Sequence, residues 1–480
     1  MADSLPVSDT SVELSRFTSR KGSRLADSLI TDGDLSDLVN SFDTALSDIR
    51  KGNETNVVID AFGRMLWQYA IDFAHGERNH RRLPGTDDRP LYWARLAMRQ
   101  SLRQWRPRFR VDADRLTDWT RRLEWSSRGI TSTSFSEEDD AIKVLISGFD
   151  PFGLQHHPSS SNPSGAAVLR LHDTTVETDA GPVRFRGVIL PVRYADFDNG
   201  LVEKIFRPHL IDGDQQVDLA VTISQGRPDS FDLEVYNGRG RYSGTTRDND
   251  GVAGGTDQLA PAQPGELDPG PEFTRSTLPM AAMMAADGKP FTVRVNPQTS
   301  RLLPGRDYLT TNHEPPEPTA IAVKGSGGGF LSNEVAYRVT RLRDELGVSV
   351  PCGHIHTPSL EAPMDVKSTT LDPDTVAAQR VDIVDQTREL LLLAVTNRQS
   401  DHQLKTAAGP HTGWTAQWWF GASRPRHFGC GPTDPPARPD RSPAPSTGSN
   451  PPPRPSDTTR SAEATPTAPA RRRERPDRSV

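Results

Sequence analysis

Cysteine is almost missing from this chain of 480 residues, which has only Cys352 and Cys430. Two cysteines cannot build the several cross-links of a disulfide scaffold, and they cannot supply the ligands of a cysteine-based zinc site. Both kinds of framework are therefore excluded.

Long apolar runs are also missing. The longest, at residues 390–395, is too short to span a bilayer. The first residues, MADSLPVSDTSVEL, have neither the basic segment nor the apolar segment of a secretory signal. We therefore expect a soluble cytoplasmic protein with no membrane partner.

The chain has no excess of basic charge, because 57 lysines and arginines face 63 acidic residues and the net charge is -6. Nothing in this balance favours nucleic acid as a partner. Hydrophobic residues make up only 34% of the chain, so we expect part of it to remain unfolded. The length suggests two or three domains.

Composition divides the chain into three regions. Residues 1–140 have apolar side chains at helical spacing, which predicts an appended helical region with segments at 58–73, 91–105 and 112–125. Residues 400–480 are rich in Pro, Arg, Ser and Thr, and we expect a largely disordered tail there. Tryptophans precede the end of this tail at 414, 418 and 419, and the sequence does not explain them.

Residues 141–399 alternate between strand-like and helix-like segments, which predicts an α/β domain. We expect a three-layer sandwich with a central, mostly parallel sheet flanked by helices. We also expect the runs 144–146 and 320–324 to lie in this one sheet. The expected strands are 144–146, 183–192, 217–224, 320–324 and 347–352. The expected helices are 278–286, 333–346 and 382–396, and 244–272 is expected to be a surface loop.

The first strand leads into the loop GFDPFG, in which Phe149 and Phe152 lie between two glycines. Ser164, after the Asn-Pro pair that follows, is the expected N-cap of the next helix. A strand–loop–helix unit at the start of an α/β domain is a common ligand site, but it is also an ordinary connection. On this stretch alone, both interpretations stay open.

Three later positions carry groups suited to catalysis. Glu234 lies among apolar residues, where a carboxylate is costly unless it is paired, although an exposed strand position would also accept it. Ser332 follows a glycine-rich turn, either as the N-cap of a helix or as a nucleophile beside backbone N–H donors. His354 and His356 alternate on a strand. A metal pair, a lone catalytic histidine and a structural histidine are the alternatives there, and no further metal ligand is evident nearby.

The order of these segments resembles the pyrrolidone-carboxylate peptidases, also called type I pyroglutamyl peptidases. The resemblance covers roughly residues 141–396 and excludes the helical region and the tail. It rests on a series of short motifs. These are VLISGFDPFG, Asn162-Pro163-Ser164, Leu190-Pro191-Val192, Gly226-Arg227 with Glu234 downstream, Ser276-Thr277-Leu278-Pro279, GGGFLSN and GHIHTP.

The resemblance implies a catalytic triad in which Glu234 and His356 fall on the family's Glu and His. Ser332 stands where the family has its nucleophilic cysteine, and Cys352 lies elsewhere. Phe149 and Phe152 match the aromatic pair that holds the pyroglutamate ring, a flat group that suits two aromatic faces.

The implied partner is a peptide with an N-terminal pyroglutamate, with no cofactor and no metal. Oligomeric state is left open between monomer and homo-oligomer. A serine, unlike a cysteine, must lose its proton during attack. A pyroglutamyl-peptidase-like hydrolase and an inactive relative that binds peptides or proteins therefore remain as alternatives.

Overall fold

The N-terminal region is helical, as its apolar periodicity predicts. The stripe at 58–73 lies in α4 (Thr55–His75), which buries Ile59, Leu66 and Trp67. The other two predicted segments form α5 (Arg89–Gln104) and α6 (Ala113–Ser126). Four further elements complete the region: α1 (Val12–Thr18), α2 (Arg20–Asp32), α3 (Ser36–Asp48) and the 3-10 turn η1 (Ile130–Ser132).

The computed structural model describes residues 11–78, 82–136, 140–242, 244–254, 258–259, 270–360 and 373–407. The predicted disordered tail lies outside the described residues from 408 onwards, together with its tryptophans and Cys430. The boundaries of the three regions stay predictions.

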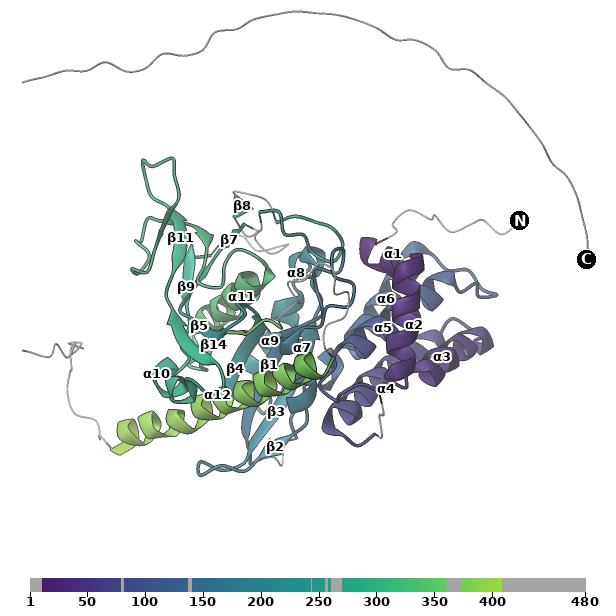
Figure 1. Cartoon of the computed structure of the whole chain (residues 1–480), viewed down its shortest axis with the longest axis horizontal. Coiled ribbons are helices and arrows are strands. Elements are labelled where there is room, and N and C mark those ends of the chain that lie inside the picture. The colour runs from purple at the N-terminus through teal and green to yellow at the C-terminus, as the bar shows by residue number, and fades with distance from the viewer. Residues whose placement is uncertain are drawn as a thin grey trace, which may run out of the picture. The chain divides into compact units, whose positions relative to one another are not determined.

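A seven-stranded sheet forms the centre of the C-terminal region, in the order β10-β5-β14-β4-β1-β3-β2 (Figure 1). Neighbouring strands are parallel except at the β14–β5 and β3–β2 pairs, so the sheet is mixed but mostly parallel. The strands are β1 (Ile142–Phe149), β2 (Thr175–Val176), β3 (Val183–Leu190), β4 (Leu219–Gln225), β5 (Ser230–Glu234), β10 (Thr292–Asn296) and β14 (Cys352–Thr357).

Helices cover both faces of this sheet, which confirms the predicted α/β sandwich. Strand β1 sends Val144 and Ile146 to one face and Leu145 to the other, and all three are fully buried. The first face carries α7 (Pro163–Leu171), which α12 (Pro373–Ala407) crosses (Figure 1). The second face carries α9 (Leu201–Leu210) and α11 (Leu331–Leu346).

One expected strand lies in a different sheet. Residues 320–324 were expected beside β1, but β13 (Ile321–Lys324) pairs antiparallel with β11 (Thr299–Leu302) in a three-stranded sheet completed by β12 (Thr310–Asn312). That placement was wrong, because a short apolar run does not indicate its partner. Two smaller sheets pair β6 (Tyr236–Gly238) with β9 (Phe273–Arg275), and β7 (Gly240–Arg241) with β8 (Gln258–Leu259).

Several expected bounds also shift. The strand expected at 347–352 begins only at Cys352, because Gly347 ends α11 in a left-handed conformation with φ 64°. The N-cap of α7 is Asn162 and not Ser164, since the Asn162 side chain accepts from the backbone N–H of Ser164. The expected helix 278–286 is a short α10 (Met280–Met283) followed by a 3-10 turn, η2 (Met284–Ala286).

The expected surface loop at 244–272 is partly wrong. Asp248 and Asn249 are buried, while most of the residues from 255 to 269 lie outside the described part of the chain. The remaining helix of the region is α8 (Tyr194–Asp198).

The helical region packs directly on the sheet region. Helix α4 contacts α7. The indole N–H of Trp67 donates to Nε2 of His172, just after α7, at 3.3 Å. Both side chains are buried, so the contact belongs to a continuous core.

Candidate active site

Polar side chains gather on the α11 face of the sheet, where β14, β4 and β5 meet. His356 lies directly opposite Asp232 of β5, and His354 lies opposite Glu234. Residues opposite one another in an antiparallel pair share a face, so all four side chains point to the same side. Because the surrounding sheet is apolar, each of these buried polar groups needs a hydrogen-bond or ion-pair partner.

Glu234 and His356 are hydrogen-bonded to each other. His356 Nδ1 lies 2.6 Å from Glu234 Oε1, and the two side chains are 10% and 1% exposed. The amide of Asn296 donates to the other carboxylate oxygen, Oε2, at 2.8 Å. With both oxygens of Glu234 acting as acceptors, His356 carries its proton on Nδ1. In the neutral ring Nε2 is then the nitrogen that can accept a proton, as a general base requires.

Ser332 lies in the first turn of α11, half-buried. The N-cap of this helix is Phe330 and not Ser332, so the capping interpretation of Ser332 was wrong. The Ser332 hydroxyl donates to the carbonyl of Gly327 at 3.1 Å. Gly327 lies close to the imidazole ring of His356, since a methyl group added to Gly327 would be 3.2 Å from His356 Cε1. The segment that holds Ser332 therefore borders the His356 ring.

Two glycines allow these segments to approach. A side chain at Gly325 would lie 2.0 Å from Oδ1 of Asn333, whose amide also pairs with the backbone of Gly238. A side chain at Gly226 would lie 2.7 Å from Cβ of His356. In both places a Cβ atom would occupy the space of a site residue or its neighbour, so only glycine fits.

The two phenylalanines of the GFDPFG loop have different surroundings. Phe149 ends β1 and is buried, stacked on Phe197 with ring centroids 6.2 Å apart. Phe152 is half-buried and lies 6.3 Å from Phe330, which in turn contacts Tyr194 edge to face at 5.7 Å. Phe152 thus belongs to an aromatic group that reaches the start of α11. The sequence reasoning missed Phe330, although it lies inside the motif GGGFLSN, and it missed Tyr194.

His354 is completely buried beside His356, with their rings edge to face at 4.7 Å. Its Nδ1 lies 2.7 Å from the Thr222 hydroxyl, and its Nε2 lies 2.8 Å from the Ser224 hydroxyl. Burial, and then the neighbouring His356, hold the pKa of His354 well below its ordinary value. His354 is therefore a neutral, fully hydrogen-bonded histidine.

The metal alternative finds no support among the residues that the structure describes. No group of three or more His, Cys, Asp or Glu side chains there has the arrangement of a metal site.

Within the described residues, no helix has both the length and the apolar character that a bilayer crossing needs. Localisation and oligomeric state stay predictions.

Comparison with known sequences gives one family for both halves of the chain. The model of the PA0049 N-terminal domain matches residues 2–124, and that of the PA0049 C-terminal domain matches residues 143–267 and 292–361. The uncharacterized protein PA0049 of Pseudomonas aeruginosa is 30% identical over 378 residues. The match covers 62% of this chain and 68% of that protein.

Comparison with solved structures gives peptidases at low similarity. A variant of pyrrolidone carboxyl peptidase from Pyrococcus furiosus has a TM-score of 0.36 and 17% identity, covering 53% of this chain and 99% of its own. The enzyme from Thermococcus litoralis has a TM-score of 0.36 and 16% identity over 54% and 96%. Pyroglutamyl peptidase I from Bacillus amyloliquefaciens has a TM-score of 0.33 and 19% identity over 53% and 95%. Values this low do not establish a shared activity.

Proposed function

The chain belongs to the family of PA0049, and we propose that it is a hydrolase of the pyroglutamyl peptidase type, which removes an N-terminal pyroglutamyl residue from peptides. The proposal draws on the ordered motifs of the sequence and on one observation in the structure. That observation is the buried hydrogen bond between Glu234 and Nδ1 of His356, which leaves Nε2 as the nitrogen available to accept a proton beside the segment that carries Ser332.

Each residue then has a role in acyl transfer. Ser332 Oγ attacks the pyroglutamyl carbonyl, and Nε2 of His356 takes the hydroxyl proton. The same proton passes to the leaving amine, which releases the shortened peptide and leaves an acyl-enzyme for water to hydrolyse. Glu234 holds His356 in its Nδ1–H tautomer and stabilises its charged form. Backbone N–H groups in the first turn of α11 are our candidates for the oxyanion site.

The aromatic group supplies the specificity in this proposal. Phe152 and Phe330 contact each other near the start of α11, and a flat lactam of low polarity can pack against such an aromatic surface. Phe149 is more deeply buried, so its role is to support the loop through its stack on Phe197.

An inactive, peptide-binding relative is the second candidate, and one observation favours it. The single proton of the Ser332 hydroxyl is donated to Gly327 and is not directed at His356. A nucleophilic serine must rotate away from this carbonyl before His356 can accept its proton. Catalytic hydrogen bonds often form only when substrate is bound, so this geometry is compatible with both candidates. One experiment distinguishes them.

The test is the release of a fluorogenic amine from a pyroglutamyl conjugate by the wild type, Ser332→Ala and Ser332→Cys. Activity in the wild type that disappears in S332A assigns Ser332 as the nucleophile. Activity only in S332C indicates an intact scaffold without its chemistry. If all three are folded and inert, the peptidase proposal fails and tight retention of the peptide would support the binding protein.

A further inference from the structure

The loop that carries Phe152 is held by charges from the helical region. Asp150 stands between Phe149 and Phe152 in the sequence, and its side chain is 2% exposed. Arg95 of α5 lies 2.9 Å from Oδ1, and Arg128, just after α6, lies 2.6 Å from Oδ2. Both carboxylate oxygens are therefore paired with a guanidinium, and both guanidinium groups come from outside the sheet region.

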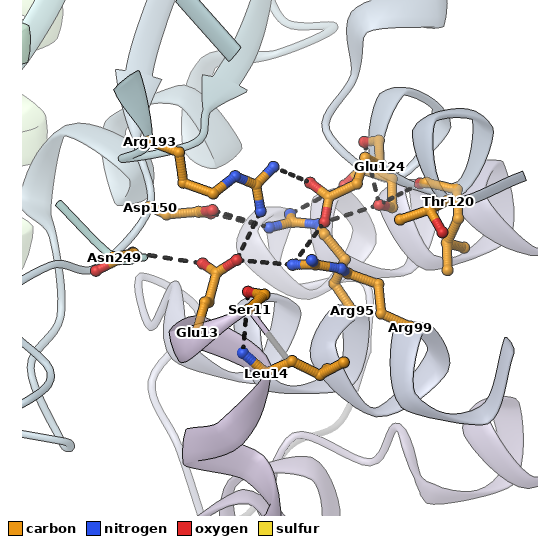
Figure 2. A network of polar contacts seen from close by, with 12 residues as sticks. Ser11, Glu13, Leu14, Arg95, Arg99, Thr120, Glu124, Asp150, Arg193 and Asn249 are labelled. Atoms are coloured by element: carbon orange, nitrogen blue, oxygen red, sulfur yellow. Dashed lines mark hydrogen bonds and ion pairs between the residues drawn. The ribbon is translucent and has the colours of Figure 1, made fainter. Parts of the chain in front are cut away.

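A network of buried ion pairs extends from this point (Figure 2). Glu124 of α6 binds Arg128 at 2.6 Å, Arg99 at 3.1 Å and Arg193 at 3.1 Å. Glu13 of α1 binds Arg99 at 2.7 Å and Arg193 at 2.6 Å. These side chains are all at most 10% exposed, and buried charges persist only when they are paired in this way.

Glu124 and Glu13 are held in their charged form. Burial on its own would raise the pKa of Glu124, but Arg128, Arg193 and Arg99 hold it well below its ordinary value. Burial opposes the charge of Glu13 as well, and Arg193 and Arg99 lower the pKa of Glu13 to about 2. The network is thus a fixed array of charges at neutral pH.

Backbone contacts hold the same loop from the other side. The N–H of Asp150 donates to Leu190 O at 3.0 Å, and its carbonyl accepts from the Asn162 amide at 3.0 Å. The carbonyl of Pro151 accepts from the Asn249 amide at 3.0 Å, and that amide also reaches Glu13 at 3.5 Å. A second path therefore joins the loop to the first helix of the chain.

We propose that the helical region is a working part of the site, in which Arg95 and Arg128 are positioning residues that act through Asp150. They hold loop 149–152 so that Phe152 faces Phe330, and so set the affinity for the acyl group of the substrate. The identity of that group rests on the proposed function, whereas the control of the loop does not. On this view residues 11–132 are required by the site and are not an independent appendage.

A matched pair of substitutions tests the proposal in the full chain. Arg128→Gln and Arg99→Gln each remove one buried guanidinium that binds Glu124, but only Arg128 touches Asp150. Asp150→Asn is the milder third variant, since it keeps the shape of the side chain. One readout is hydrogen exchange at the amides of residues 149–153, which needs no ligand. The other is the Kd of a pyroglutamyl peptide, measured in a Ser332→Ala background.

We expect R128Q and D150N to speed exchange in the loop by about tenfold or more and to weaken the Kd by a similar factor. R99Q should leave the loop exchange rate and the Kd within about twofold of the parent values. This should hold even if R99Q lowers the Tm as much as R128Q does. Unchanged loop exchange in R128Q and D150N, or an equal change in R99Q, would overturn the proposal. If the parent protein binds no pyroglutamyl peptide, the proposed function fails while loop exchange still decides the role of Arg128.

Discussion

Nδ1 of His356 lies 2.6 Å from Oε1 of Glu234, although the two residues are 122 positions apart in the sequence. They meet because β14 and β5 run antiparallel, with His356 opposite Asp232 and therefore diagonal to Glu234. Asn296, from the adjacent parallel strand β10, occupies the second oxygen of the carboxylate. Three strands thus fix the orientation of one imidazole ring.

Replacing Glu234 by glutamine should remove most of the proposed activity. Two N–H groups point at this carboxylate, but a glutamine amide offers one acceptor and one donor. If the NH₂ group faces His356, the imidazole must adopt the other tautomer and Nε2 becomes protonated. We expect kcat to fall on the order of 10³- to 10⁴-fold, measured by release of the fluorogenic amine.

The double variant E234Q/N296A tests whether the competition between His356 and Asn296 for the glutamine oxygen causes the loss. Without the Asn296 amide, the glutamine NH₂ can turn away from His356 and its oxygen can accept from Nδ1. Part of the lost activity should then return. A double variant that is no more active than E234Q would show that charge, and not the tautomer, is what Glu234 supplies.

Gly226→Ala should impair the site more than it impairs the fold. The new methyl carbon would lie 2.7 Å from Cβ and 3.0 Å from Cγ of His356, so the ring must shift. A shift of about 1 Å at a catalytic group costs on the order of 10²-fold in rate. Gly327→Ala is the graded comparison, because its methyl would lie 3.2 Å from Cε1 and should cost less. Equal losses in both variants would contradict this account.

The sequence predicted the elements of the fold better than their partners. Helix α4 and strand β1 were predictable because periodicity and burial are local properties of the chain. The placement of 320–324 in the central sheet was wrong, because β13 pairs with β11 in a small sheet completed by β12, and these two short strands lacked any clear pattern. Strand pairing depends on distant residues, and apolar content alone does not encode it.

The candidate site shows the same division. The motifs predicted that Glu234 and His356 serve one site, but nothing in the sequence singled out Asn296, which reaches Glu234 from an edge strand. Arg95 and Arg128 were equally hidden, because an arginine in a helical segment is usually an exposed one. The packing of the helical region on loop 149–152 gives both arginines a shared partner in Asp150.

His172 should make the protein less stable in mild acid. Nε2 of His172 accepts a hydrogen bond from the Trp67 indole N–H, so protonation of Nε2 would place two N–H donors opposite each other. Burial lowers the pKa of His172 to about 4. The unfolded chain binds a proton below about pH 6.5, while the folded protein does not until about pH 4. Stability from this group is therefore lost as pH falls through that window.

His172→Gln is the variant that isolates this effect. The free energy of unfolding, measured in urea from pH 7.5 to pH 4, should fall more steeply for the wild type than for H172Q. The difference in unfolding free energy between wild type and H172Q should therefore be smaller at pH 4 than at pH 7.5 by on the order of 3 kcal/mol. The other titrating groups are the same in both proteins, so their contributions cancel in this difference. Parallel curves would show that His172 becomes protonated in the folded protein without cost.

His354 should remain neutral and in one tautomer over the whole pH range in which the protein is folded. The Thr222 hydroxyl donates to the carbonyl of Gly353 and can therefore only accept from Nδ1–H of His354, which leaves Nε2 to accept from Ser224. Nitrogen-detected NMR of labelled histidines should show protonated Nδ1 and bare Nε2. Ser224→Ala should preserve this tautomer, whereas Thr222→Val should release it. A charged His354 near neutral pH would contradict the assignment, and it would also place a second positive charge 4.7 Å from the ring of His356, where it would oppose the proton that His356 must accept during catalysis.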